Sequence, residues 1–398
     1  MTVLPAAAWR GEPGLLRVID ALGGAEMTRA VGGAVRDTLL GLPVSDVDLA
    51  TELRPDDVMA RLEAAGIKAV PTGIAHGTVT AVADGRPYQV TTLRRDVTTD
   101  GRRATVAFAD DWAEDAARRD FTINALYADP VGGAVYDPVG GLADLAARRV
   151  VFIGDAATRI DEDHLRILRW FRFLARFGDG AVDEATFAVV TGRAAKLRGL
   201  SRERIADELL RILALADPVG TVALMERAGV LGEIVPEALS DPVARVRALV
   251  ANEAAARVAG DAALRLIALL PVDMAVAESI AHRLKLTKRM HKRIAIARGG
   301  TMELPIRGLA YRIGIEGARD RVMLGDGSAL GLLGKVEGWT VPKLPIGGGE
   351  LVAMGVPPGP DVARLLHAAE DRWVEEGFPD RQRTMAIARE VVSRLRSK

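Results

Sequence analysis

The chain has no cysteine among its 398 residues. This excludes disulfide bonds, thiolate zinc sites and cysteine nucleophiles, and it fits the reducing cytoplasm. Long apolar runs are missing as well, because no stretch approaches the roughly 18 residues of a membrane span. The first residues also lack the basic and apolar regions of a signal peptide. We therefore expect a soluble, cytoplasmic protein that makes no membrane contact.

An excess of charge of either sign is absent too. Lys plus Arg and Asp plus Glu both number 53, so the formal net charge is zero. A surface that binds nucleic acid must therefore come from local clustering of cations. Hydrophobic residues make up 49% of the chain, which is enough for a buried core. The length favours about two to four domains.

Two kinds of sequence follow one another. Up to residue 149, strand and helix patterns alternate, and Asp84-Gly85 predicts a hairpin between the strand-like stretches 76–83 and 88–93. Beyond residue 149, helical periodicity dominates and Gly and Pro divide it into helices of ordinary length. We therefore predict the α+β class, with a small mixed sheet and helices in an N-terminal head, followed by an extended all-α portion.

The stretch 31–51, VGGAVRDTLLGLPVSDVDLAT, combines features that suit phosphate chemistry. Gly32 and Gly33 let backbone N–H groups approach a polyphosphate closely, and Arg36 on the following short helix supplies a positive fork. A glycine pair by itself is more often an ordinary strand-to-helix connection. Neither the Walker lysine pattern nor a dinucleotide GxGxxG is present.

Asp46 and Asp48 end this stretch two residues apart. They alternate with Val47 and Leu49 in a predicted strand over 44–51, so the two carboxylates point to the same face. Close carboxylates repel each other unless a cation lies between them, and oxygen ligands suit Mg²⁺. Such ions activate an attacking hydroxyl and stabilise a leaving phosphate. A lone pair of this kind is more often a surface feature, so the informative signal is the order of glycines, arginine, helix and aspartates.

The residues GGAVRDTLLGLPVSDVDLAT closely resemble the active-site signature of class II template-independent nucleotidyltransferases, the family of CCA-adding enzymes and bacterial poly(A) polymerases. Further stretches resemble blocks of that family in the same order: TGIAHGTVT (72–80), RRDFTINAL (118–126), DPVGGLADL (137–145) and EDHLRILRWFRF (162–173). The resemblance covers roughly the first 215 residues. It implies a catalytic head at 1–149, a helical neck that recognises the nucleotide base at 150–215, a helical body at 216–300 and an RNA-binding tail at 301–398.

Asp163 and Arg166 are candidates for base recognition. In a predicted helix over 160–177 they stand at i and i+3 and are neighbours, which is also typical of a plain surface ion pair. Cytosine and adenine both present an amino donor beside a ring-nitrogen acceptor, whereas guanine and uracil reverse this order. A carboxylate beside a guanidinium would accept C and A and reject G and U. The resemblance implies that these two residues pair with the incoming base.

Other residues complete the predicted nucleotide site. The resemblance implies contacts for Arg119, Arg169 and Arg172, although an i+3 row drifts about 60° per step, so a structural role for Arg172 is the alternative. In a predicted helix over 115–126, Asp120 and Asn124 suit a ribose hydroxyl, while a helix cap is the alternative for Asp120. The predicted nucleotide-binding set is Gly33, Arg36, Arg119, Asp120, Asn124, Asp163, Arg166, Arg169 and Arg172. The predicted catalytic and metal-binding residues are Asp46 and Asp48.

Two features bear on the exact activity. Many family members carry a third acidic residue just before a VTT sequence, where this chain has Gln89 in YQVTTLR. Metal binding then rests on Asp46, Asp48 and substrate phosphates, and Asp96 is a less favourable further candidate. The polar stretch 94–111, expected to be a flexible loop with a short strand at 105–108, resembles the loop that CCA-adding enzymes need to switch from C to A. It favours full CCA activity.

Positive charge clusters in the segment 282–298, HRLKLTKRMHKRIAIAR, which has no acidic residue. It suits a phosphate backbone, and a solvated helix face is the alternative. The candidate RNA-binding residues are Lys285, Lys288, Arg289, Lys292 and Arg293.

We therefore predict an Mg²⁺-dependent transferase that adds C, C and A from CTP and ATP to the 3′ end of tRNA and releases pyrophosphate. Its partner is tRNA, bound at the 3′ end and acceptor arm, and no protein partner is implied. The alternatives are a poly(A) polymerase and an enzyme that adds only CC or only A. An alternative of another class is a catalytically silent RNA-binding protein.

Overall fold

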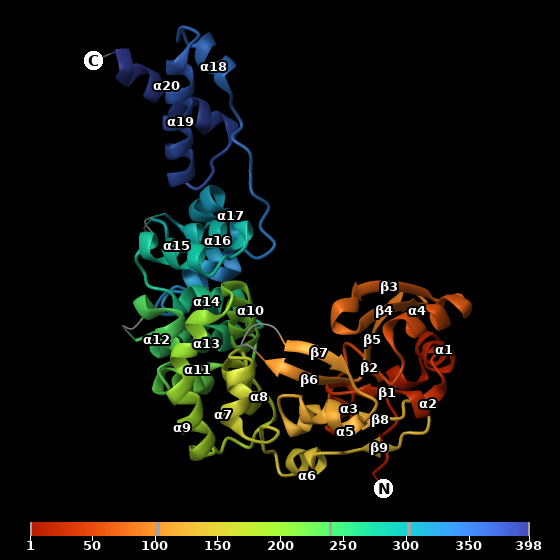
Figure 1. Cartoon of the computed structure of the whole chain (residues 1–398). Helices are drawn as coiled ribbons and strands as arrows, with labels where there is room; N and C mark the ends of the chain where they lie inside the picture. Colours follow the sequence, from red (N-terminus) through yellow and green to blue (C-terminus); the bar gives the residue numbers. More distant parts are fainter. Residues whose placement is uncertain (1, 100–103, 239–240, 301–303, 397–398) are drawn as a thin grey trace. The chain divides into compact units, whose positions relative to one another are not determined.

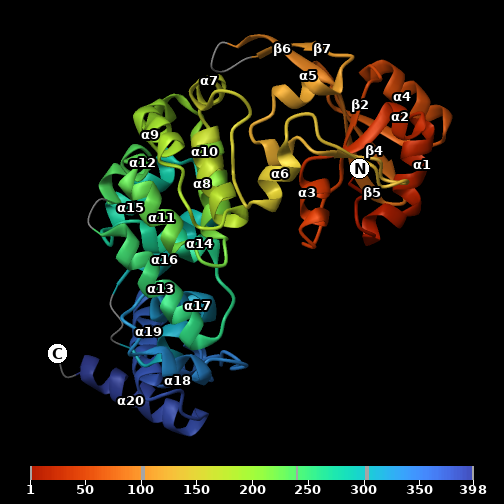
Figure 2. The same cartoon turned by 90° about the horizontal axis from the view of Figure 1, so that it is seen from below.

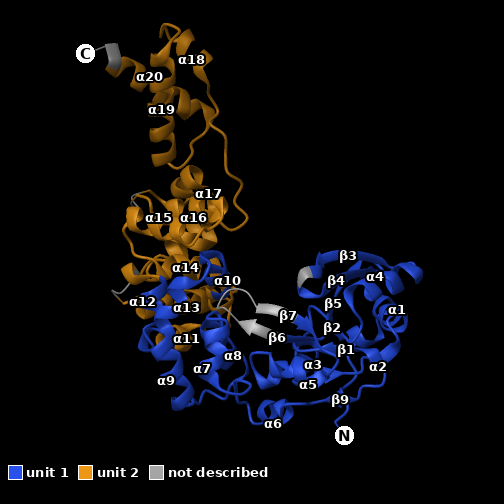
Figure 3. Cartoon of the chain, in the orientation of Figure 1, with its two compact units in different colours: residues 1–208, 224–234 blue, residues 209–223, 235–398 orange. Residues whose placement is uncertain are grey.

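The computed structural model describes residues 2–99, 104–238, 241–300 and 304–396. The chain divides into two compact units, residues 1–208 with 224–234 and residues 209–223 with 235–398 (Figure 3). The predicted division into a head, neck, body and tail is finer than this, and it stays a prediction.

The first unit contains a mixed seven-stranded sheet with the order β3-β4-β5-β2-β1-β8-β9. The strands are β1 Thr28–Val31, β2 Asp48–Thr51, β3 Lys68–Gly73, β4 Thr78–Ala83, β5 Arg86–Thr92, β8 Tyr127–Ala128 and β9 Val135–Tyr136. β2 and β5 run parallel, and the other neighbours are antiparallel. The α+β class and the hairpin at Asp84-Gly85 are confirmed. Both turn residues have positive φ, 53° and 77°, as a two-residue hairpin turn requires.

Two helices cover the sheet beside β4. They are α1 (Pro13–Ala21) and α4 (Pro55–Ala64), each with a proline in its first turn, where a missing N–H costs nothing. Both pack on β4 and lie beside the strands in Figures 1 and 2. Their apolar faces bury Leu15, Val18 and Leu62 completely, so this layer holds the sheet in place by ordinary core packing.

The stretch 94–111 is an antiparallel ribbon for much of its length. β6 (Arg94–Thr99) pairs with β7 (Ala104–Phe108), and Arg94 stands opposite Phe108. The predicted strand at 105–108 is confirmed. The prediction of a loop before it is wrong for residues 94–99, which form β6, because the β-branched run Val97-Thr98-Thr99 favours a strand. Residues 100–103, also part of the predicted loop, lie outside the described residues.

Two predicted helices are interrupted. The helix expected over 160–177 is α7 (Ala156–Glu162) and α8 (Arg166–Phe177), separated by extended backbone at Asp163, with φ −147° and ψ 103°. The cause is capping: Leu165 N donates to Asp163 Oδ1 over 3.1 Å, a bond that favours a helix end over a helix interior. The helix expected over 115–126 is likewise α5 (Trp112–Ala117) followed by the short helix η3 (Thr122–Asn124).

In the first unit α9 (Glu184–Arg193) follows α8, and α10 (Arg202–Leu213) begins there and ends in the second unit. The described residues of the second unit are helical, without a strand. Its further helices include α13 Pro242–Ala256, α14 Ala262–Leu269, α15 Met274–Arg283, α16 Lys288–Arg298, α17 Ile306–Met323, α18 Gly348–Ala353, α19 Pro360–Glu375 and α20 Arg381–Arg396. A buried ion pair of 2.7 Å joins Arg265 and Glu253. Within the described part of the chain, no helix is long and apolar enough to span a membrane.

Candidate active site

The glycine pair forms a sharp turn between β1 and α3 (Gly33–Leu39). Gly32 has φ 68° and ψ −116°, a conformation that glycine adopts without steric cost. Its N–H donates to the carbonyl of Leu126 over 3.0 Å. A Cβ at this position would lie 3.4 Å from the carbonyl oxygen of Asn124 and 3.8 Å from Nη1 of Arg119. The turn therefore brings the 118–126 segment next to the predicted phosphate loop.

The two aspartates lie at the start of β2, with Asp48 as its first residue and Asp46 before it. The strand begins at Asp48, so the strand predicted over 44–51 is too long at its beginning. The alternation nevertheless holds, because Asp46 and Asp48 are exposed while Val47 and Leu49 are 8% and 0% exposed. Asp48 stands opposite Val31, the residue before the glycine pair. The structure thus brings the glycine turn and the aspartates together.

Gln89 is the direct neighbour of Asp48 in the parallel pair of β2 and β5. Residues in register on adjacent strands point to the same face, and both side chains are exposed. Although Asp48 is exposed, partial loss of hydration around its carboxylate and the charge of Asp46 raise its pKa, against the attraction of Arg119. The described residues contain no group of three His, Asp or Glu side chains suited to a metal. The side chain of Asp96 lies outside the described part of the chain.

Arg36 is buried, with 5% of its surface exposed. Its Nε donates to Asp37 Oδ1 over 2.8 Å, its Nη1 donates to Asn124 Oδ1, and its guanidinium lies 4.0 Å from the ring centre of Phe177. Burial lowers its pKa. Because its nitrogens are engaged within the protein, this geometry favours a role in holding the site together over direct phosphate contact.

A chain of polar contacts continues from Arg36 to α8. Asn124 Nδ2 donates to Asp120 Oδ1 over 2.9 Å, and Arg169 Nε donates to Asp120 Oδ2 over 2.7 Å. Burial acts to raise the pKa of Asp120, but Arg169, Asn124 and a backbone N–H outweigh it and lower the pKa. Three predicted nucleotide-binding residues are therefore linked directly, and Arg36 connects them to the glycine turn.

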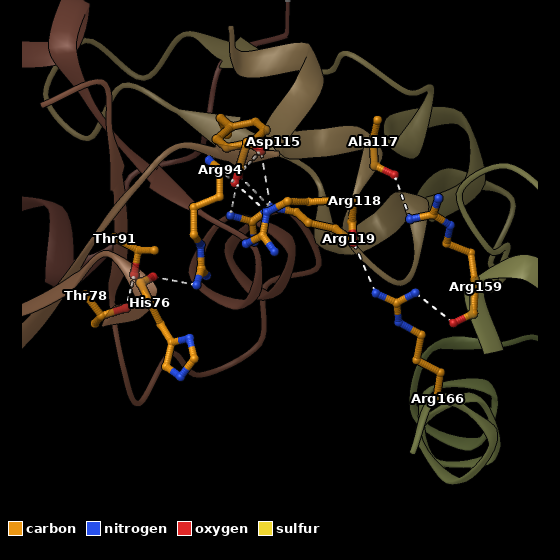
Figure 4. A network of polar contacts seen from close by, with 11 residues as sticks. His76, Thr78, Thr91, Arg94, Asp115, Ala117, Arg118, Arg119, Arg159 and Arg166 are labelled. Carbon is orange, nitrogen blue, oxygen red and sulfur yellow. Dashed lines mark hydrogen bonds and ion pairs between the residues drawn. The ribbon is translucent and has the colours of Figure 1, made fainter. Parts of the chain in front are cut away.

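Asp115 is a further residue of the site, and the sequence analysis did not single it out. It is 1% exposed and accepts hydrogen bonds from Arg118 Nε (3.0 Å), Arg119 Nη2 (2.9 Å), the Tyr127 hydroxyl (2.7 Å) and the backbone N–H of Arg94 (3.2 Å) (Figure 4). Burial alone would raise its pKa, but the two arginines and Tyr127 lower it to about 2. The spacing of three and four residues to the arginines was the available sequence signal.

Arg166 reaches the same network from α8. Its Nη2 donates to the carbonyl of Arg118 over 3.1 Å, and its Nη1 donates to the carbonyl of Arg159 over 2.8 Å (Figure 4). Nη1 also donates to Glu162 Oε2 over 2.6 Å. Asp163 forms an ion pair with Arg204 instead, with 2.8 Å between Oδ2 and Nη2. The predicted base-reading residues thus have separate partners, which excludes a surface ion pair between them as the reason for their spacing.

The remaining candidates differ in their surroundings. Arg172 Nε donates to the buried carboxylate of Glu208 on α10, which favours the structural alternative considered for it. Arg293 on α16 forms ion pairs of 2.6 Å with Asp320 and 2.7 Å with Asp261, so it has an internal role in the second unit. The other candidate RNA-binding residues are exposed: Lys285, Lys288, Arg289 and Lys292.

The sheet and the site define a nucleotidyltransferase head. Residues 28–151 match the family model described as the Poly A polymerase head domain, and residues 181–241 match the model described as a probable RNA- and SrmB-binding site of polymerase A.

Comparison with known proteins shows the family to which the chain belongs. The chain is 33% identical to CCA tRNA nucleotidyltransferase 1, mitochondrial, of Mus musculus over 88% of this chain and 83% of that protein. It is 44% identical to the CCA-adding enzyme of Levilactobacillus brevis over 46% of this chain and 45% of that protein. The crystal structure of the Bacillus stearothermophilus CCA-adding enzyme in complex with CTP aligns with a TM-score of 0.76 and 27% identity, covering 97% of this chain and 98% of that one. The chain belongs to the family of CCA-adding tRNA nucleotidyltransferases.

The depressed pKa of Asp115 predicts a pH-dependent contribution to stability. Relative to Asp115→Asn, the wild type should gain about 2–3 kcal/mol of unfolding free energy at pH 7 from this charge. Because the folded pKa is lowered, the gain is complete above about pH 4 and is lost as the pH falls toward 2. Urea denaturation of both proteins at several pH values measures the difference.

The charge-matched control is Asp110→Asn, since that side chain is 84% exposed. It should show no comparable stability loss at pH 7. A difference between wild type and Asp115→Asn that stays constant down to pH 2.5 would contradict the ionised, hydrogen-bonded state of Asp115.

Proposed function

We propose that this protein adds C, C and A to the 3′ end of tRNA, using CTP and ATP and releasing pyrophosphate. The observation that carries the proposal is the 33% identity to a CCA tRNA nucleotidyltransferase over most of both chains. The geometry supports it, because the glycine turn, both aspartates and Arg119 lie at one site of the first unit.

The aspartate pair fits Mg²⁺. Two exposed carboxylates share one face, and a cation between them would relieve the repulsion between Asp46 and Asp48. Mg²⁺ takes one or two protein carboxylates and completes its shell with water and substrate phosphates, so a third carboxylate is not essential. We propose Asp46 and Asp48 as the ligands, with the neutral amide of Gln89 beside them. When bound, the metal supplies activation of the RNA 3′-hydroxyl and charge neutralisation at the phosphates.

The protein's own groups position the nucleotide. The backbone N–H of Gly33 and the Arg119 guanidinium face the triphosphate in this proposal, and Asp115 holds Arg119 in the required orientation. Asp120 and Asn124 form the ribose side of the site together with Arg169. Arg36 and Arg172 bond to Asn124 and Glu208, so we propose that both arginines hold the nucleotide-binding groups in position.

Asp163 and Arg166 choose the base. The carboxylate accepts a hydrogen bond from the amino group of C or A, and the guanidinium donates one to the adjacent ring nitrogen. Uracil and guanine would place a carbonyl against the carboxylate and an N–H against the guanidinium. A polar group left without a partner in such a site costs more binding free energy than a matching hydrogen bond contributes. Binding of uracil and guanine is therefore disfavoured without a template.

The exposed cations of the second unit are the proposed contacts for the tRNA acceptor arm, since phosphates dominate affinity for RNA. They are Lys285, Lys288, Arg289 and Lys292.

The lack of cysteine supports a reducing compartment, and we propose the cytoplasm. Two relatives, from mouse and zebrafish, are named as mitochondrial proteins, so localisation of a tagged chain is the corresponding test.

The activity is tested by incubating the protein with tRNA that lacks its 3′ CCA, together with Mg²⁺, CTP and ATP. We expect three added residues with both nucleotides and two with CTP alone. Long A tails would identify a poly(A) polymerase, and products that stop at two residues would identify a CC-adding enzyme. Incorporation of a single A only on tRNA that already ends in CC would identify an A-adding enzyme.

The matched control is the double variant Asp46→Asn, Asp48→Asn. It should bind tRNA as the wild type does and add no residue. If the wild type also adds nothing while it binds tRNA, the protein is an RNA-binding member without catalysis.

Gln89 gives a separate prediction about the metal. Gln89→Glu should tighten Mg²⁺ binding about tenfold, because a third carboxylate beside Asp48 adds charge to the site. Calorimetric titration of Mg²⁺ into the protein without nucleotide measures this directly. Gln89→Leu, which is neutral and of similar size, should show no such gain. Equal Mg²⁺ affinities of Gln89→Glu and the wild type would mean that position 89 does not face the metal.

A further inference from the structure

Arg204 makes the contact that carries a further inference. It lies in the first turn of α10, and its side chain is 48% exposed. Its Nη2 donates to Asp163 Oδ2 over 2.8 Å, while Leu165 N donates to Asp163 Oδ1 over 3.1 Å. Each oxygen of the base-reading carboxylate is thus held by one donor from the protein.

The backbone at Asp163 explains why such restraint matters. The residue lies between α7 and α8 in extended conformation, so no helix fixes the direction of its side chain. The bond from Leu165 restrains it locally, and Arg204 adds a restraint from a helix further along the chain. The side chain remains 33% exposed. Because an ionised carboxylate offers about four acceptor positions, two stay available to a nucleotide.

We propose that Arg204 is a positioning residue for base selection. It prevents the Asp163 carboxylate from rotating, so that the carboxylate always presents a lone pair to the exocyclic group of the base. A carboxylate free to rotate can turn away from the carbonyl of U or G and relieve the repulsion. A restrained carboxylate cannot, so the penalty against the wrong base is kept. This inference rests on the proposed function and assigns a new residue to it.

The ion pair between Arg204 and Asp163 also allows the opposite role, in which Arg204 hinders binding of the base. If Arg204 only competed with the base for Asp163, its removal would tighten nucleotide binding and leave selectivity unchanged. The two roles therefore predict different changes in KM and in selectivity. Exposed ion pairs contribute little to folding stability, so an Arg204 variant is expected to fold.

The test compares Arg204→Ala and Arg204→Lys with wild type in single-nucleotide addition to tRNA lacking its CCA. We expect the ratio of kcat/KM for CTP to that for UTP to fall about fivefold in Arg204→Ala. Arg204→Lys should restore part of the ratio, because its ammonium still donates to Asp163. The KM for CTP should rise in Arg204→Ala and not fall.

Arg202→Ala is the matched control. Arg202 lies two residues away on α10, and it bonds weakly to the carbonyl of Arg198 over 3.5 Å. Both alanine variants lose one positive charge, so effects on tRNA binding are shared, and only Arg204→Ala should change the CTP to UTP ratio. An unchanged ratio in Arg204→Ala, with or without a lower KM, overturns the positioning role. If the wild type adds neither C nor A, the proposed function itself fails. If Asp163→Ala loses selectivity and Arg204→Ala does not, only the inference about Arg204 fails.

Discussion

The buried carboxylate of Asp115 is the constraint on which the candidate site depends. A charge in this position is costly unless donors surround it, and here four groups donate to it. These donors come from the base of the β6–β7 ribbon, from both arginines of the 118–126 segment and from Tyr127. The carbonyl of Arg118 in turn accepts from Arg166. One charge therefore fixes the side chain proposed for the triphosphate and is connected to the side chain proposed for the base.

The candidate metal and phosphate residues and the candidate base residues lie on different structural elements. The start of β2 places Asp46 and Asp48, and Asp115 holds Arg119. These groups suit the metal and the phosphates that every nucleotide carries. The break between α7 and α8 places Asp163 and Arg166, the residues proposed to meet the base, which is the part that differs between nucleotides. The polar chain from Arg36 to Arg169 connects these two regions within the first unit. Catalysis in such a site consists of positioning and charge neutralisation, with no covalent step by the protein.

Local periodicity was enough to predict part of this site. The alternation of Asp46 and Asp48 with apolar residues is visible in the sequence. The interest of Gln89 followed from the resemblance, because many family members have an acidic residue there, and the structure adds that it is the neighbour of Asp48. The break at Asp163 was missed because Ile160, Ile167 and Phe171 keep helical spacing on both sides of it, while a capping bond from Leu165 to Asp163 favours a helix end. Asp115 was missed because two of its donors, from Arg94 and Tyr127, are distant in sequence. Arg36 likewise appeared suited to phosphate until its contacts with Asn124 and Phe177 were visible.

The central claim is that protein side chains, and no template, choose the base. Asp163→Asn tests it most directly, because the amide can rotate to present an N–H donor where the carboxylate only accepts. Incorporation of each of the four nucleotides into tRNA lacking its CCA should be measured for this variant and the wild type. The account predicts that Asp163→Asn gains UTP and GTP incorporation relative to CTP and ATP. The wild-type preference for C and A, retained at full catalytic efficiency in Asp163→Asn, would contradict it.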